Sequence, residues 1–148
     1  MSLTRRHMLT GTIGTFAWVL ALCPRPARAA DEVDDFVEQW IGRKATPSDR
    51  LKLMMPAEFS TGYTVPMDIS VDSPMTEADH VKSVRVFAPK NPLVEVVQFH
   101  FVPRRSLPRV STRIRLAAPQ HVVALAEMSD GSLLTAKAWV AVASNGCL

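Results

Sequence analysis

Cysteine is scarce in this 148-residue chain, which contains two. Two cysteines cannot form the disulfide framework that staples many small secreted domains. Long apolar runs are also missing, because no stretch after about the first 30 residues approaches the roughly 20 apolar residues of a membrane-spanning helix. The sequence has no internal repeat and no low-complexity tract. These absences favour one globular domain that builds its own hydrophobic core and has no membrane span.

The N-terminus has the pattern of a targeting signal rather than of folded structure. Arg5 and Arg6 precede a moderately apolar run over residues 8–23, and residues 27–29 (Ala-Arg-Ala) have the small-x-small pattern that signal peptidase cuts after. The paired arginines and the weakly apolar run resemble a twin-arginine signal, which exports folded proteins; an ordinary secretory signal is the alternative. We predict an export signal over residues 1–29 and a mature protein in the periplasm.

Removal of the signal changes the charge balance. The whole chain has 17 Lys and Arg against 14 Asp and Glu, but four arginines lie in the signal, which leaves 13 basic residues and a net charge of −1. The basic character of the whole chain therefore gives no argument for nucleic acid or an anionic membrane as a partner.

Removal of the signal also leaves a single cysteine. Cys23 leaves with the signal, and the bulky Leu22 before it argues against lipid attachment there. Cys147 then stands alone in an oxidising compartment, close to the C-terminus, where residues are usually exposed. An exposed thiol serves as a nucleophile, a disulfide partner or an attachment point. We predict that Cys147 is functional rather than a buried structural cysteine.

The mature chain, of about 119 residues, is predicted to form one domain over residues 30–143. It begins with a helix that Asp31 can cap and Gly42 can end. An apolar stripe recurs at helical spacing and comprises Val33, Phe36, Val37, Trp40 and Ile41. Residues 43–49 have the composition of a linker. We expect the helix to pack on the domain that follows or to cover an edge strand.

The rest of the domain is predicted to consist of short strands separated by turns that Pro and Gly mark. Strands are predicted over residues 51–54, 65–71, 83–88, 94–102, 109–116, 121–128 and 133–142, and apolar and polar residues alternate over 94–102 and 109–116. The last two strands form a hairpin around residues 129–132. Seven short strands without βαβ alternation predict an all-β fold, an immunoglobulin-like antiparallel β-sandwich preceded by one short amphipathic α-helix.

Other residues with reactive side chains give weaker signals. The histidines lack metal-ligand spacing and the methionines are scattered, so exposed strand faces and core packing explain them better than a metal site does; they are His80, His100, His121, Met54, Met55, Met67, Met75 and Met128. Arg104, Arg105 and Arg109 fit a solvated Pro-rich loop, and Asp130 fits a hairpin turn. No His or carboxylate adjoins Cys147 as a base, although one could come from elsewhere in the fold. We expect no cofactor, no metal and no catalytic residue.

Several sequence runs resemble, in order, the SoxY family, the sulfur-carrier subunits of the bacterial thiosulfate-oxidising system. The runs are DSPMT at 72–76, VKS at 81–83, FAPKNP at 87–92, VSTRIRL at 110–116 and AEMSDGS at 126–132. The likeness extends from the region of Phe36 to Cys147, and several matching runs in order are more specific than any short motif.

The resemblance implies a carrier rather than an enzyme. Such a protein forms an immunoglobulin-like sandwich and a heterodimer with a second small β-sandwich subunit, SoxZ. Sulfur intermediates are held covalently on the cysteine that matches Cys147, after a haem enzyme has joined thiosulfate to the thiol. A metal-dependent hydrolase then releases sulfate, and a molybdenum enzyme oxidises the remaining sulfur. The carrier arm would comprise residues 144–148, with Ser144, Asn145, Gly146 and Leu148 around the cysteine.

The arm departs from the family pattern Gly-Gly-Cys-Gly-Gly. Gly146 precedes Cys147, but Leu148 follows it, and a terminal carboxylate one residue from the thiol disfavours the thiolate. Because small and turn-forming residues follow the last strand, we expect a tip that is loose from Ser144 onward. The departure leaves three readings open: a carrier for another sulfur species or other enzymes, a carrier that pairs but no longer loads, and a structural or binding sandwich with an intermolecular disulfide at Cys147.

Overall fold

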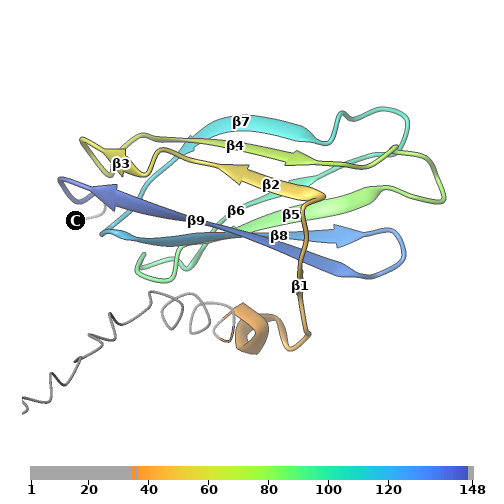
Figure 1. Cartoon of the computed structure of the whole chain (residues 1–148), viewed down its shortest axis with the longest axis horizontal. Helices are drawn as coiled ribbons and strands as arrows, with labels where there is room; N and C mark the ends of the chain where they lie inside the picture. The colour runs from red at the N-terminus through yellow and green to blue at the C-terminus, as the bar shows by residue number, and fades with distance from the viewer. Residues whose placement is uncertain (1–34, 36, 147–148) are drawn as a thin grey trace, which may run out of the picture.

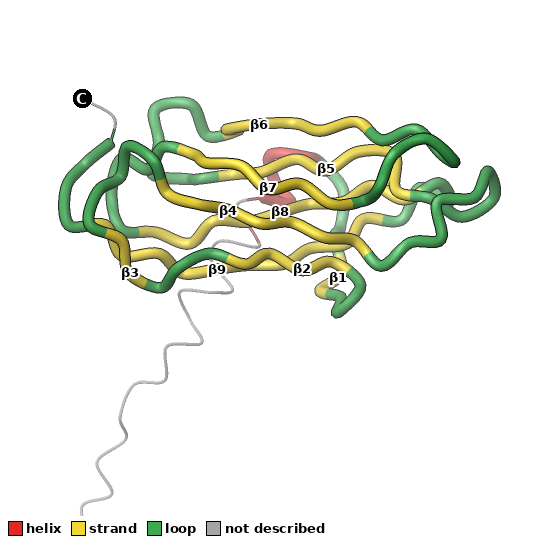
Figure 2. Tube along the Cα trace, turned by 90° about the horizontal axis from the view of Figure 1, so that it is seen from above, coloured by secondary structure: helices red, strands yellow, loops and turns green. Residues whose placement is uncertain are grey.

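The computed structural model describes residues 35 and 37–146, which form two β-sheets stacked face to face with a short helix beneath the larger sheet (Figure 1). The larger sheet contains, in spatial order, β1 (Thr46–Pro47), β9 (Leu133–Val142), β8 (Gln120–Met128), β5 (Val81–Phe87) and β6 (Glu95–His100), and β3 (Glu58–Phe59) joins it at β9. The smaller sheet contains β2 (Leu51–Met54), β4 (Val65–Val71) and β7 (Arg109–Ile114). The strands of both sheets run along the long axis of the molecule (Figure 2). The predicted all-β sandwich is confirmed.

The seven predicted strands all form. The bounds of β2, β4 and β9 are the predicted ones, and those of β5, β6, β7 and β8 differ by at most two residues at either end.

The structure also contains two short strands that the sequence did not predict, β1 and β3. Both pair with β9 in parallel, so the described sheet is not antiparallel throughout, and residues 43–49 are not only a linker. A strand of two residues has no periodicity of its own. Its pairing depends on β9 lying beside it.

The main core lies between the two sheets and follows the period of two that an extended chain imposes on its side chains. In β4, Val65, Met67, Ile69 and Val71 are buried and the residues between them are half-buried. In β7, Ile114 is buried, whereas the arginines on the opposite face of the strand are exposed. The alternation predicted for β7 is confirmed.

A second apolar cluster lies on the outer face of the larger sheet. There Val123 and Leu125 of β8 contact Phe87 of β5 and Val37 of the helix, while alternate β8 residues face the main core. Because β8 is covered on both faces, its sequence is almost continuously apolar. Complete burial of an aliphatic or aromatic side chain stabilises the fold by about 1.5–3 kcal/mol, so this cluster holds the helix on the sheet.

The helix itself covers residues 35 and 37–41 within the described part of the chain. Gly42 ends it, as predicted, with a φ of +70° and an N–H that donates to the Glu38 carbonyl at 2.8 Å. The prediction that Trp40 belongs to the buried stripe was wrong, because 55% of Trp40 is exposed. The helix meets the sheet through Val37 and Ile41, one turn apart.

The remaining helix predictions, which concern Asp31, Val33 and Phe36, lie outside the described residues. Within the described ranges, no helix has both the length and the apolar character to cross a membrane.

Candidate functional site

The predicted carrier residues lie directly after β9, at one end of the sandwich (Figure 1). Ser144, Asn145 and Gly146 are described by the structure, whereas Cys147 and Leu148 lie outside the described residues. The site is therefore defined here by the contacts that hold the chain up to Gly146.

Four residues from three distant segments meet at this point through their main chains, and we call them the C-terminal clasp: Gly62, Leu116, Ser144 and Gly146. The Gly62 N–H donates to the Ser144 carbonyl at 2.7 Å, and the Leu116 N–H donates to the Gly62 carbonyl at 2.8 Å. The Gly146 N–H donates to the Leu116 carbonyl at 2.9 Å. Gly146 is buried, so the tip that we expected to be loose from Ser144 onward is held to the domain as far as Gly146.

The clasp depends on glycine at two of its positions. A Cβ atom on Gly62 would lie 2.6 Å from the Gly146 nitrogen and would collide with the Leu116 carbonyl oxygen. A Cβ atom on Gly146 would lie 2.8 Å from the Tyr63 nitrogen and would collide with the Gly62 carbonyl. Real Cβ atoms essentially never approach other atoms more closely than 3.0 Å. Gly146 therefore supplies space for a close backbone crossing, in addition to any freedom of rotation.

A buried polar network holds the segment around Leu116. The Asn91 amide nitrogen donates to the Arg115 carbonyl at 2.8 Å, and the Asn91 side-chain oxygen accepts from the Ala117 N–H at 2.8 Å. The same oxygen accepts from the Gln120 amide at 3.0 Å, and Gln120 is 1% exposed. Asn91 thus fixes the main chain on both sides of Leu116, the residue that contributes two hydrogen bonds to the clasp.

Sequence reasoning missed Gly62, Asn91 and Gln120. Asn91 belongs to one of the runs that resemble the family, but it was interpreted only as part of a turn. Gly62 lies among small and polar residues with no pattern that marks it. Their roles rest on contacts between segments far apart in the chain, which a single sequence does not reveal.

Charged and apolar side chains both lie on the segments that form the clasp. Arg113 and Arg115 are exposed, and the Arg113 guanidinium donates to the Thr64 carbonyl at 3.3 Å, two residues from Gly62. Tyr63 is 48% exposed. A shallow cavity of about 340 Å³ adjoins the clasp between β3 and the end of β9, lined by Glu58, Phe59, Ser60, Ala141, Val142 and Ala143. The lining of this cavity is mainly apolar and includes one carboxylate, and neither arginine belongs to it.

The three described histidines have different surroundings. His100 is exposed on β6, as predicted, and the His80 Nδ1 lies 2.9 Å from the Thr76 carbonyl oxygen. The His121 ring meets the edge of Trp139 at 4.9 Å between centroids. In the part of the chain that the structure describes, no group of three or more His, Cys, Asp or Glu is placed to hold a metal ion. The predicted core role of methionine is confirmed for Met67, Met75 and Met128, which are buried, and was wrong for Met54, which is 57% exposed.

Two carboxylates have a pKa below the ordinary value because of local hydrogen bonds. Arg85 donates to Glu95 from Nε at 3.1 Å and from Nη2 at 2.6 Å, and this pairing lowers the pKa of Glu95. The Ser132 hydroxyl and N–H donate to Asp130 and lower the pKa of Asp130. Gly131, with a φ of +85°, completes the hairpin turn predicted there. Local pairing accounts for both shifts.

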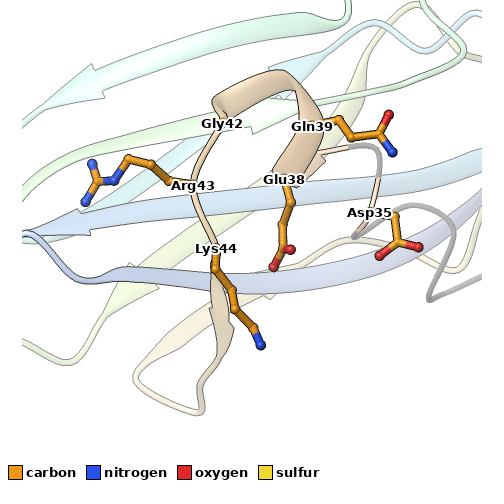
Figure 3. Close-up of a pocket in the computed structure, with 6 residues that line it drawn as sticks. All are labelled: Asp35, Glu38, Gln39, Gly42, Arg43 and Lys44. Carbon is orange, nitrogen blue, oxygen red and sulfur yellow. The ribbon is translucent and has the colours of Figure 1, made fainter.

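A second shallow cavity, of about 390 Å³, lies at the end of the helix (Figure 3) and is lined by Asp35, Glu38, Gln39, Gly42, Arg43 and Lys44. The Glu38 carboxylate accepts from the Ala45 N–H at 3.1 Å. Arg43 points away from Glu38, and its guanidinium donates to the Gly131 carbonyl and lies 3.9 Å from Glu127. One lining residue of this cavity, Arg43, therefore contacts the β8–β9 hairpin. The hairpin lies at the end of β9 opposite the clasp.

Three comparisons relate the chain to known proteins. The family model described as "Sulfur oxidation protein SoxY" matches residues 37–147. A search of the curated proteins gives no match. Among solved structures, the chain is similar to the sulfur carrier protein SoxY from Chlorobium limicola f thiosulfatophilum, with 25% identity and a TM-score of 0.56 over 76% of this chain and 97% of that one.

Superoxide reductases have a similar fold. The neelaredoxin from Ignicoccus hospitalis is 17% identical, with a TM-score of 0.57 over 79% of this chain and 92% of that one. At this identity the likeness concerns the fold alone. The family model, in contrast, covers most of the sequence and extends through the clasp to residue 147. The chain belongs to the SoxY family of sulfur oxidation proteins.

Proposed function

We propose that this protein is a periplasmic sulfur carrier that holds intermediates of thiosulfate oxidation covalently on Cys147 and presents them to partner enzymes. The observation that carries the proposal is the family match, which includes Cys147 at its end. The similar solved structure from Chlorobium limicola is itself described as a sulfur carrier. In this role Cys147 is an attachment point, and the chemistry is performed by enzymes that act on it.

Loading joins the Cys147 thiolate to the outer sulfur of thiosulfate. One S–S bond forms, the product is a cysteine S-thiosulfonate, and the haem loading enzyme would accept the two electrons in one-electron steps. Hydrolysis by the metal-dependent enzyme then breaks the bond between the two cargo sulfurs. Water supplies the fourth oxygen of sulfate, two protons are released, and a persulfide remains on Cys147 for oxidation by the molybdenum enzyme.

The surroundings of the clasp suit this cargo. The exposed Arg113 and Arg115 raise the local concentration of anions such as thiosulfate and offset the repulsion between an anionic adduct and nearby carboxylates.

We also propose that the protein pairs with a SoxZ-like β-sandwich subunit and reaches the periplasm through the signal over residues 1–29. Co-expression with such a subunit followed by size-exclusion chromatography tests the pairing, and a protein that stays monomeric contradicts it.

The direct test of carriage is intact-protein mass spectrometry. Mature protein and its Cys147→Ser variant are incubated with thiosulfate and the haem loading enzyme, with the partner subunit present. We expect the mass of one thiosulfate-derived adduct on the wild type and none on the variant, with unchanged thermal stability. An unmodified wild type, or a Cys147 found only in a protein–protein disulfide, contradicts carriage and favours the structural reading.

A further inference from the structure

We infer that Gly62 is a positioning residue for Cys147, and that the C-terminal clasp fixes the point from which the carrier cysteine leaves the domain. This inference rests on the proposed function, because it assigns Gly62 to the carrier site. Gly62 lies 85 positions before Cys147 in the sequence. Its role follows from the crossing between its main chain and the segment that precedes the cysteine.

The clasp restricts where the residue after Gly146 can lie. The Gly146 N–H is bonded to Leu116 at 2.9 Å and the Ser144 carbonyl to Gly62 at 2.7 Å, so both ends of the tripeptide 144–146 are held. Because consecutive Cα atoms are about 3.8 Å apart, the next residue is tethered at the end of the sandwich while the clasp is closed. A tip that was loose from Ser144 would extend this reach by roughly 10 Å.

Such tethering matters because an enzyme must bring the thiolate and thiosulfate into a reactive geometry. Orientation of reacting groups contributes a large part of catalytic acceleration, and a misplacement of about 1 Å can cost roughly a hundredfold in rate. A carrier tethered to Gly146, which lies beside the Tyr63 main chain, offers its partner a single point of attachment to recognise. The clasp should therefore affect kcat/KM for loading by the enzyme and leave the reactivity of the thiol towards a small reagent unchanged.

Gly62 is glycine for reasons of space and not of backbone conformation. Among the described glycines, Gly42 and Gly131 have positive φ angles, of +70° and +85°, whereas Gly62 does not. An alanine at position 62 is therefore free of φ strain but would collide with the main chain of Leu116 and Gly146. Gly131→Ala provides the opposite case, with strained φ, no close contact and no link to the clasp.

The experiment compares wild type, Gly62→Ala and Gly131→Ala as mature protein with the partner subunit. Three quantities are measured: kcat/KM for loading by the haem enzyme with thiosulfate, the alkylation rate of Cys147 with iodoacetamide, and amide hydrogen exchange at Leu116 and Gly146. For Gly62→Ala we expect loading to fall about tenfold or more, alkylation to stay within about twofold or to rise, and exchange at both amides to accelerate. For Gly131→Ala we expect loading and both amides to remain as in the wild type.

A second variant separates positioning from folding. Insertion of Gly-Gly between Gly146 and Cys147 leaves every contact of the clasp in place and lengthens the tether by roughly 7 Å. We expect reduced loading with normal thermal stability and normal exchange at Leu116 and Gly146. If both Gly62→Ala and the insertion variant load like the wild type, the positioning role is overturned. If the wild type itself does not load, the proposed function fails instead. Slow hydrogen exchange at the Gly146 amide would in that case still show that the clasp forms.

Discussion

The two ends of the described chain are attached to the sandwich by different means. The N-terminal helix is held by side chains, because Val37 and Ile41 enter an apolar cluster with Phe87 and Leu125 on the outer face of the larger sheet. The C-terminal segment is held by main-chain hydrogen bonds between Gly62, Leu116, Ser144 and Gly146.

The difference has consequences for precision and for tolerance to mutation. Apolar contacts are non-directional, so a helix held by them can shift slightly and can accept other apolar residues of similar volume. Main-chain hydrogen bonds have narrow ranges of distance and angle, and the glycine crossing leaves no room for a side chain. The helix attachment therefore contributes mainly stability, and the clasp contributes mainly position.

The largest effect on stability is expected for Phe87→Ala, which would weaken the attachment of the helix to the larger sheet. Phe87 is fully buried, and its truncation leaves a cavity that should lower the free energy of unfolding by about 3–5 kcal/mol. Denaturant unfolding measures the loss, and Leu93→Ala, at a position that is 79% exposed, is the control. Loading of the remaining folded protein should be normal. A folded Phe87→Ala protein that fails to load would mean that the two ends are coupled.

An intermediate effect is expected for Asn91→Ala, which weakens the support of the clasp. The substitution leaves the Arg115 carbonyl, the Ala117 N–H and the Gln120 amide without this partner, at a cost of about 1–3 kcal/mol. Hydrogen exchange should accelerate at Leu116 and Gly146 but not in the helix cluster. Lys90→Ala is the neighbouring surface control. Unchanged exchange at Leu116 would show that the clasp holds without the Asn91 network.

The smallest effect is expected for Glu95→Gln, which removes one charge of a partly exposed ion pair. The pairing with Arg85 lowers the pKa of Glu95, so the carboxylate stabilises the folded state above the ordinary glutamate pKa of about 4.3. This contribution is lost as pH falls through the lower pKa of the folded state. Because the two side chains are 28% and 30% exposed, we expect about 1 kcal/mol or less near pH 7.

The measurement is the difference in unfolding free energy between wild type and Glu95→Gln from neutral to acidic pH. The difference should shrink as the pH falls below about 4. Because the hydrogen bonds from Ser132 lower the pKa of Asp130 in both proteins, the contribution of Asp130 cancels in the difference. A difference that is independent of pH would contradict the pairing as the source of the lowered pKa.

The parts of the fold that could be predicted are those whose local pattern agrees with their burial. The alternation over residues 109–116 predicted the buried face of β7, and Asp130-Gly131 predicted the hairpin. Trp40 was assigned to the buried stripe because helical spacing alone cannot tell how wide a surface the sheet offers. Thr46–Pro47 and Glu58–Phe59 could not be predicted, since each is a strand only because β9 lies alongside.

The amino-acid sequence by itself determined the seven longer strands and the membership of the family, because side-chain patterns along a strand and ordered motifs are properties of the linear chain. It also singled out Cys147 as the candidate carrier residue. The tertiary structure alone decided how the segment before that cysteine is held. The hydrogen bonds of the clasp join the main chains of Gly62, Leu116, Ser144 and Gly146. They use main-chain groups, so no side-chain pattern predicts them.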